Sequence, residues 1–176
     1  MCVSEYTSSR VQQKIGALSN ICIENLGVNK KIFQPSNVKR KNQICFIGNH
    51  KKRKGFDILC DALKIVNFKL NYTLKVICIG NFSPSSLNKA KDFCKELRNI
   101  QLEFLLGVSE RDLIEIYQIS KINVLPATEA NGHFEGFGYT HIEAIACGTW
   151  SIGSYESGNR DAIEKRNGYL LRKQSG

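Results

Sequence analysis

The sequence predicts an α/β fold built on a doubly wound parallel sheet, and two patterns indicate it. Short apolar runs that end in glycine, such as ICFIG at 44–48 and VICIG at 76–80, are typical of strands buried on both faces of a parallel sheet. Amphipathic segments stand between these runs and are joined to them by short loops. Strands that alternate with helices in this way favour a parallel sheet with helices on both faces.

The individual elements follow from local signals. In the segment 55–66, Phe56, Leu59 and Leu63 recur at helical intervals. The segments 83–97 and 109–120 open with serines, a proline or a Ser-x-x-Asp pattern, which are typical helix starts. We therefore expect strands at 44–48, 73–80, 100–107, 122–126, 149–154 and 168–172, and helices at 55–66, 83–97, 109–120, 137–147 and 159–165.

The first 43 residues differ from this regular pattern. Residues 3–16 favour a short helix, and residues 21–36 favour a strand followed by a loop. We interpret 1–43 as the remnant of an interdomain region with its linker, and 44–176 as one domain, which ends soon after its last strand with no closing helix.

The composition is that of a globular chain in a reducing compartment. Apolar residues make up 42%, and no apolar run reaches the roughly 18 residues that a membrane span needs. The first residues lack the pattern of a signal peptide. The seven cysteines show no C-x-x-C pair and mostly sit in apolar runs, where reduced cysteine acts as a small hydrophobe. We expect a cytoplasmic protein, with a peripheral place at the membrane left open.

The chain carries a formal net charge of +9, which favours partners that bear phosphate. The excess is concentrated in VKRKNQ at 38–43 and HKKRKG at 50–55, and both runs are also explained as solvated basic loops. No recognised nucleic-acid motif accompanies them, so nucleic acid is not expected as a partner, although a basic interaction or nucleic-acid-binding module stays an alternative.

Three features fall where parallel strands end, which is where open sheets bind ligands. In the loop after the first strand, Gly48 would allow a sharp turn, and Lys54 stands directly before a helix, where it could meet a phosphate. The segment EGFG then leaves the backbone of Gly136 and Gly138 open at a helix start, which favours anions. The simpler explanations are a solvated lysine and a tight turn.

The third feature is a pair of glutamates eight positions apart, Glu135 and Glu143. Glu143 lies in an apolar helix beside Ile142 and Ile145, where an unpartnered carboxylate is costly. Either an internal salt bridge to a lysine or arginine satisfies Glu143, or the hydroxyl groups of a sugar do.

Together these segments resemble the C-terminal, donor-binding domain of family 4 glycosyltransferases, whose fold is called GT-B. The resemblance runs through nearly the whole chain. It rests on ICIENLGVNKKIFQPS at 21–36, FIGNHKKRKGFDILCDAL at 46–63, LEFLLGVSERDLIEIYQISKINVLPA at 102–127 and, most specifically, EGFGYTHIEAIACGT at 135–149.

The resemblance implies a Rossmann-like domain that binds a nucleotide diphosphate sugar for retaining transfer without a metal or other cofactor. Glu135 would contact the donor sugar and, with Lys54, serve catalysis, while Glu143 would bind the ribose. The other donor-binding residues implied are Gly48, Asn49, Arg53, Leu106, Val108, Gly136, Phe137 and Gly138. A separate N-terminal half would bind the acceptor, which the sequence does not identify as saccharide, lipid-linked or protein.

We expect the sequence to lack the acceptor-binding N-terminal domain and the closing C-terminal helices of the family. It also departs from the family pattern at two positions. Asn49 stands where the family usually has arginine, and Arg53 is the candidate to replace that arginine from the same loop. Trp150 stands where a proline usually follows CGT. A truncated or degenerate donor-binding domain without catalysis therefore stays an alternative.

Overall fold

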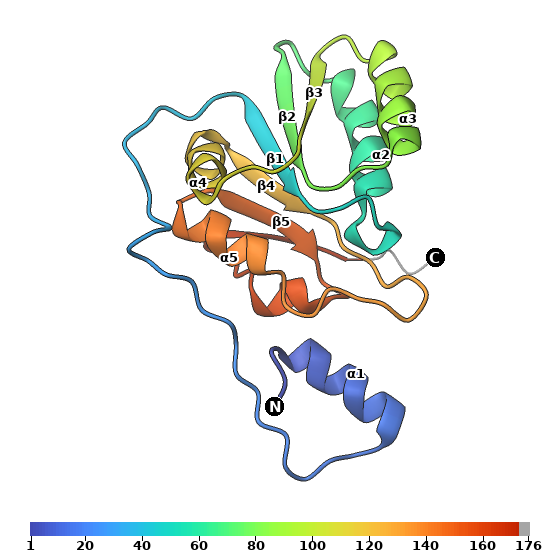
Figure 1. Ribbon diagram of the computed structural model, residues 1–176, viewed down its shortest axis with the longest axis vertical. Helices are drawn as coiled ribbons and strands as arrows, with labels where there is room; N and C mark the ends of the chain where they lie inside the picture. Colours follow the sequence, from blue (N-terminus) through green and yellow to red (C-terminus); the bar gives the residue numbers. More distant parts are fainter. Residues whose placement is uncertain (173–176) are drawn as a thin grey trace.

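The computed structural model describes residues 1–172, apart from the side chain of Lys91, and residues 173–176 lie outside the description. Its centre is a six-stranded parallel sheet in the order β3-β2-β1-β4-β5-β6, which confirms the predicted doubly wound α/β fold (Figure 1). The strands are β1 (Gln43–Ile47), β2 (Leu74–Ile79), β3 (Ile100–Leu105), β4 (Ile122–Leu125), β5 (Trp150–Ser154) and β6 (Gly168–Leu171).

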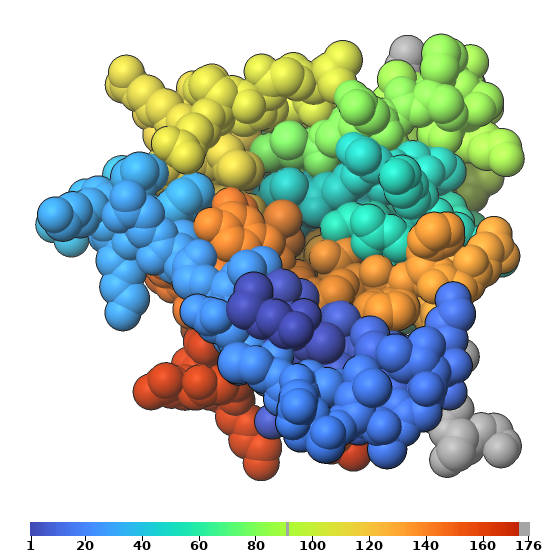
Figure 2. All heavy atoms as spheres, turned by 60° about the horizontal axis from the view of Figure 1, so that its bottom comes forward, coloured from blue at the N-terminus to red at the C-terminus, as the bar shows by residue number. Residues whose placement is uncertain are grey.

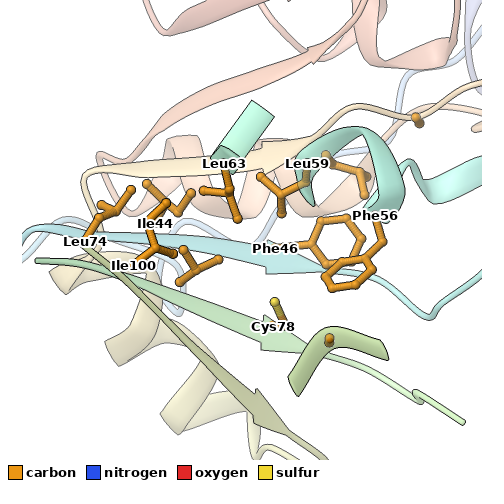
Figure 3. Close-up of a cluster of buried hydrophobic side chains, with 12 residues drawn as sticks. Ile44, Phe46, Phe56, Leu59, Leu63, Leu74, Cys78 and Ile100 are labelled. Carbon is orange, nitrogen blue, oxygen red and sulfur yellow. The ribbon is translucent and has the colours of Figure 1, made fainter. Parts of the chain in front are cut away.

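Helices α2 and α3 cover one face of the sheet (Figure 1). Phe56 and Leu59 of α2 point toward Phe46 of β1, and the buried cluster continues to Cys78 of β2 and Ile100 of β3 (Figure 3). Removal of this apolar surface from water is the main source of stability for this layer. The elements on this face are α2 (Phe56–Asn67) and α3 (Pro84–Lys95).

Helices α4 (Glu110–Ile119) and α5 (Tyr139–Ala146) cover the other face. Successive residues of a strand point to opposite faces of the sheet. Cys45 therefore packs under α4 and α5, and its neighbours Ile44 and Phe46 pack under α2. Tyr117 of α4 is completely buried in this second cluster. Among the described residues, no helix is long and apolar enough to cross a membrane.

The strand order places a switch point between β1 and β4. These strands are neighbours, but the chain leaves β1 toward β2 and leaves β4 toward β5, in opposite directions. The loops that follow them, residues 48–55 and 126–138, consequently diverge at the carboxyl edge of the sheet. This is the usual ligand position in open α/β sheets.

The N-terminal segment forms helix α1 (Glu5–Ile15), as predicted, and then crosses to β1 in an extended path without a regular strand (Figure 1). The strand expected at the start of 21–36 is wrong. Only one isolated bridge, between Cys2 and Ile23, forms there, because most of this segment is exposed and has no neighbouring strand to pair with.

The basic run at 38–43 is not simply a solvated loop, because the Arg40 side chain connects the ends of two helices. Its guanidinium donates to the carbonyl groups of Tyr117 (3.1 Å) and Ser120 (2.5 Å) at the end of α4. It also donates to the carbonyl of Cys147 (2.9 Å) at the end of α5. A cation that binds the last carbonyls of a helix stabilises them, and Arg40 does so for two helices at once.

The helix expected at 159–165 is shorter than predicted. The structure has a 3-10 turn at Gly158–Asp161 instead. The Asn167 side chain accepts the Glu164 N–H at 2.8 Å and so starts the turn that leads into β6. Helix α5 also begins two residues later than expected, at Tyr139, after a left-handed Gly138.

Candidate functional site

The two loops at the switch point contact each other through their backbones. The Thr128 N–H donates to the carbonyl of Arg53 at 2.8 Å. Gly55 has a left-handed φ of 73°, and a Cβ there would lie 2.0 Å from the Pro126 carbonyl oxygen. Only glycine fits this approach, which holds the basic loop against the loop that carries Glu135.

This contact brings three of the predicted site residues together. Glu135 Oε2 accepts from Arg53 Nη1 and from Lys54 Nζ, each at 2.7 Å. The three side chains are mostly buried, with exposed fractions of 13% for Glu135, 26% for Arg53 and 16% for Lys54. By contrast, Lys51 and Lys52 of the same loop are exposed. The basic loop therefore divides into two inward cations and two outward ones.

The predicted anion-binding segment lies beside this cluster. The backbone N–H groups of Gly136, Phe137 and Gly138 make no hydrogen bond within the described part of the chain. Gly138 adopts a left-handed φ of 86°, and a Cβ there would lie 2.5 Å from Asn159 Oδ1. Unpaired amides directly before the first turn of α5 are the chemistry that an anion requires.

Glu143 has a partner inside the protein, and that partner takes only one of its oxygens. Tyr117 donates its hydroxyl to Glu143 Oε2 at 2.9 Å in a buried hydrogen bond. Burial raises the pKa of Glu143, and the tyrosine hydrogen bond partly opposes that rise. Because a carboxylate accepts several hydrogen bonds, Glu143 keeps capacity for hydroxyl groups of a ligand.

The loop that the resemblance associates with the base follows β3. Leu106 is 75% exposed, and Val108 is half-buried against the cluster that contains Tyr117. Glu110, two residues further, lies near enough to Glu143 to raise the pKa of that carboxyl. Leu106 and Val108, the residues expected at the base, thus lie in a loop on the face of the sheet that also carries Glu143.

Gly48 lies beside the side chain of Lys54, whereas Asn49 contacts a different loop. The backbone bends at Gly48 as expected, although its φ is not left-handed. A Cβ on Gly48 would meet only side-chain atoms at 3.4 Å. Asn49 is exposed, and its Oδ1 accepts the Asn81 N–H at 3.0 Å. Its side chain therefore joins the loop after β2, away from the Glu135 cluster.

His141 was not identified from the sequence. It is completely buried in α5, with Nδ1 3.1 Å from Asn123 Nδ2. Burial, helped by the charge of Lys54, lowers the pKa of His141 to about 3, so the ring is neutral at pH 7. A polar residue among Ile142, Ala144 and Ile145 was a visible signal, but nothing in the sequence indicated its partner on β4.

Tyr117 was missed for a similar reason. It stands at an apolar position of a predicted helix, where it is indistinguishable from a core aromatic residue. A buried tyrosine hydroxyl usually needs a hydrogen-bond partner. Glu143, which has no evident partner in the sequence, was the signal that could have identified Tyr117.

Comparison with known proteins gives the family. The model of the family described as "Glycosyl transferases group 1" matches residues 28–175. A curated relative, an uncharacterized glycosyltransferase of Methanocaldococcus jannaschii, is 28% identical over 176 residues. That match covers 99% of this chain and 45% of the archaeal protein, so the chain spans less than half of that relative's length.

Solved structures give the same fold. The C-terminal domain of LpcC, a glycosyl transferase group 1 family protein from Francisella tularensis, has a TM-score of 0.64 at 24% identity, covering 85% of this chain and 82% of that one. Anabaena HepE, solved with UDP and glucose, has a TM-score of 0.75 at 18% identity, covering 98% of this chain and 49% of that one. These likenesses show the fold of a GT-B C-terminal domain. The family match shows that this chain belongs to the group 1 glycosyltransferases.

Proposed function

We propose that the switch-point edge of this domain binds a nucleotide diphosphate sugar and presents the sugar for retaining transfer, as in family 4 enzymes. The observation that carries this proposal is the cluster of Arg53, Lys54 and Glu135, which joins the loops after β1 and β4. Two inward cations beside a row of unpaired amides suit a diphosphate, and a carboxylate beside them suits a sugar hydroxyl.

In this proposal, charge that develops on the leaving diphosphate is met by Lys54, Arg53 and the amides of Phe137 and Gly138. Such preorganised donors stabilise developing charge without a metal ion. Nucleotide affinity should therefore survive a chelator. A large loss with chelator that magnesium or manganese restores would contradict this assignment.

The ribose is assigned to Glu143, whose free oxygen faces no other partner among the described residues, and the base to the loop at 106–108. The Tyr117 hydroxyl would keep the carboxylate in place while ribose hydroxyls donate to it. UDP is a suitable probe, because HepE was solved with UDP or UDP-glucose and the neighbours GtfA and TarM were solved with UDP.

The acceptor requires a further half, which we propose lies in an N-terminal domain or a separate partner chain. Correct positioning of two reactants is worth about 7–11 kcal/mol of barrier. Residues 1–176 alone should thus bind the donor and transfer almost nothing. The experiment measures donor binding and product formation on one sample, before and after addition of a candidate N-terminal half. Robust turnover by residues 1–176 alone would contradict this division of roles.

A second candidate is a domain that binds nucleotide sugar without catalysis. The side chain of Asn49 favours it, because that side chain serves the loop after β2 instead of supplying a cation. Donor binding with no turnover, even with the N-terminal half added, would favour this candidate.

A further inference from the structure

Helix α1 contacts the candidate donor loop at one carbonyl group. The hydroxyl of Thr7 donates to the Gly136 carbonyl oxygen at 2.9 Å, and the Ser4 hydroxyl lies 2.5 Å from the same oxygen. Ser4 is completely buried and also accepts the Thr7 N–H at 2.9 Å as the cap of α1. Two hydroxyl groups of the N-terminal segment therefore converge on the backbone of EGFG.

Other contacts fix α1 against the same loop and against the neighbouring 3-10 turn at Gly158–Asp161. The rings of Tyr6 and Phe134 meet edge to face with centroids 5.4 Å apart. Arg10 Nη2 lies 2.5 Å from Glu129 Oε1. The Tyr6 N–H donates to Asp161 Oδ2 at 3.2 Å. Figure 2 shows the result, with the blue atoms of the N-terminal segment lying against orange atoms of the segment that includes this loop. These contacts with the loop and with the 3-10 turn hold α1 in one position relative to Gly136.

The carbonyl that receives these hydroxyls belongs to the same peptide group as the Phe137 N–H. In a planar trans peptide, the C=O and the N–H point in opposite directions. Fixing the Gly136 carbonyl toward α1 consequently fixes the direction of the Phe137 N–H. Neither this N–H nor that of Gly138 is used by the described residues. The Gly136 carbonyl is thus fixed from the side of α1, and the Phe137 and Gly138 N–H groups keep their hydrogen-bonding capacity.

We propose that Ser4 and Thr7 are positioning residues for the diphosphate site. They hold the Gly136–Phe137 peptide so that the amides of Phe137 and Gly138 meet a diphosphate. This inference rests on the proposed donor site and adds a part of the chain that lies before residue 28, outside the family match. The effect should be specific for the phosphates, because Glu143 and Tyr117 lie on other elements.

The test uses the whole 176-residue chain with UDP and uridine as probes in titration calorimetry. The informative variant is Ser4→Ala/Thr7→Val, which removes both hydroxyl groups and keeps the size of the Thr7 side chain. Thr7→Ser keeps the hydroxyl. Ser9→Ala is the matched control, because among the described residues the Ser9 hydroxyl bonds only within α1, to the Tyr6 carbonyl at 2.8 Å.

The double variant should bind UDP about tenfold more weakly and uridine within about twofold of the wild type. Thr7→Ser and Ser9→Ala should bind both probes as the wild type does. Amide exchange in residues 129–138 should be faster in the double variant and unchanged in Ser9→Ala, which reports the loop without any nucleotide.

Three outcomes would overturn the inference. Unchanged affinity for both probes in the double variant would show that the hydroxyl groups do not position the site. An equal loss of UDP and uridine affinity, with a lower melting temperature, would show a purely structural role. No UDP binding by the wild type would overturn the proposed function itself and the inference with it, and the wild-type titration distinguishes that case.

Discussion

Glu135 Oε2 lies 2.7 Å from Lys54 Nζ, so the carboxylate and the lysine proposed for catalysis neutralise each other without a ligand. Arg53 shares the same oxygen. A diphosphate that enters this site must compete with Glu135 for the two cations. The change in UDP affinity when Glu135 is replaced therefore measures this competition.

Replacement of Glu135 by glutamine should strengthen UDP binding, because it frees both cations and removes a negative charge near the diphosphate. We expect a gain of about threefold to tenfold, together with loss of any sugar transfer that the chain shows when the proposed N-terminal half is added. Titration calorimetry with UDP and a product assay measure the two effects. Weaker UDP binding by a folded Glu135→Gln variant would contradict the competition.

Lys54 and Lys52 provide a matched pair within one loop. Lys54→Ala should reduce UDP affinity tenfold or more and leave uridine affinity nearly unchanged, since Lys54 is mostly buried beside the site. Lys52 is exposed, and a solvated charge contributes little, so Lys52→Ala should reduce UDP affinity less than about twofold. Equal small effects of both substitutions would show a nonspecific basic patch.

Glu143→Gln tests the ribose assignment. Loss of a charged hydrogen bond corresponds to roughly 1.5–3 kcal/mol, so UDP affinity should fall about tenfold or more. Uridine affinity should fall by a similar factor, which distinguishes this site from the diphosphate contacts. Tyr117→Phe should cause a smaller loss, because the carboxylate stays but loses its internal donor. Identical uridine titrations for wild type and a folded Glu143→Gln would exclude the ribose contact.

His141 predicts how stability depends on pH. Its pKa is lowered from 6.5 to about 3 in the folded state, so below pH 6.5 the unfolded chain takes up a proton that the folded chain does not. The stability from the neutral ring is present above pH 6.5 and is lost as pH falls toward 3. The free energy of unfolding should fall by about 1.4 kcal/mol per pH unit from this group.

Urea unfolding at pH 6.5 and pH 5 measures this loss. The wild type should lose about 2 kcal/mol more over this interval than His141→Gln does. His133 is exposed, and His133→Gln should keep the wild-type dependence on pH. The same slope in His141→Gln as in the wild type would show that another group is responsible.

The fold was predictable because its signals are local. Buried parallel strands are continuous apolar runs, and the run at 44–48 needs no distant residue to be recognised. The helix at 159–165 and the strand near residue 21 were wrong because tertiary contacts decide them. One is cut short by the Asn167 side chain, and the other has no neighbouring strand to pair with.

The charged residues of the candidate site were predictable from the sequence. The contacts that hold its loops and helices in place were not. The spacing of Glu135 and Glu143 and the position of Lys54 were visible in the sequence, and the structure places Lys54 on Glu135. The contacts of Arg40 and Ser4 join segments more than 75 residues apart. No local pattern encodes such pairings, so only the folded chain reveals what holds the site.

The most direct test of the central claim is an amide proton–nitrogen NMR titration of the 176-residue chain with UDP. We expect the amides of Phe137 and Gly138 and those of the loop at 48–55 to shift most, with and without chelator, and Lys54→Ala to reduce the shifts. The contrary result would be no shifts at these positions, or shifts confined to the opposite edge around the cavity of about 360 Å³ that Ile122 and Leu74 help to line. That result would show that the switch-point edge is not the nucleotide site.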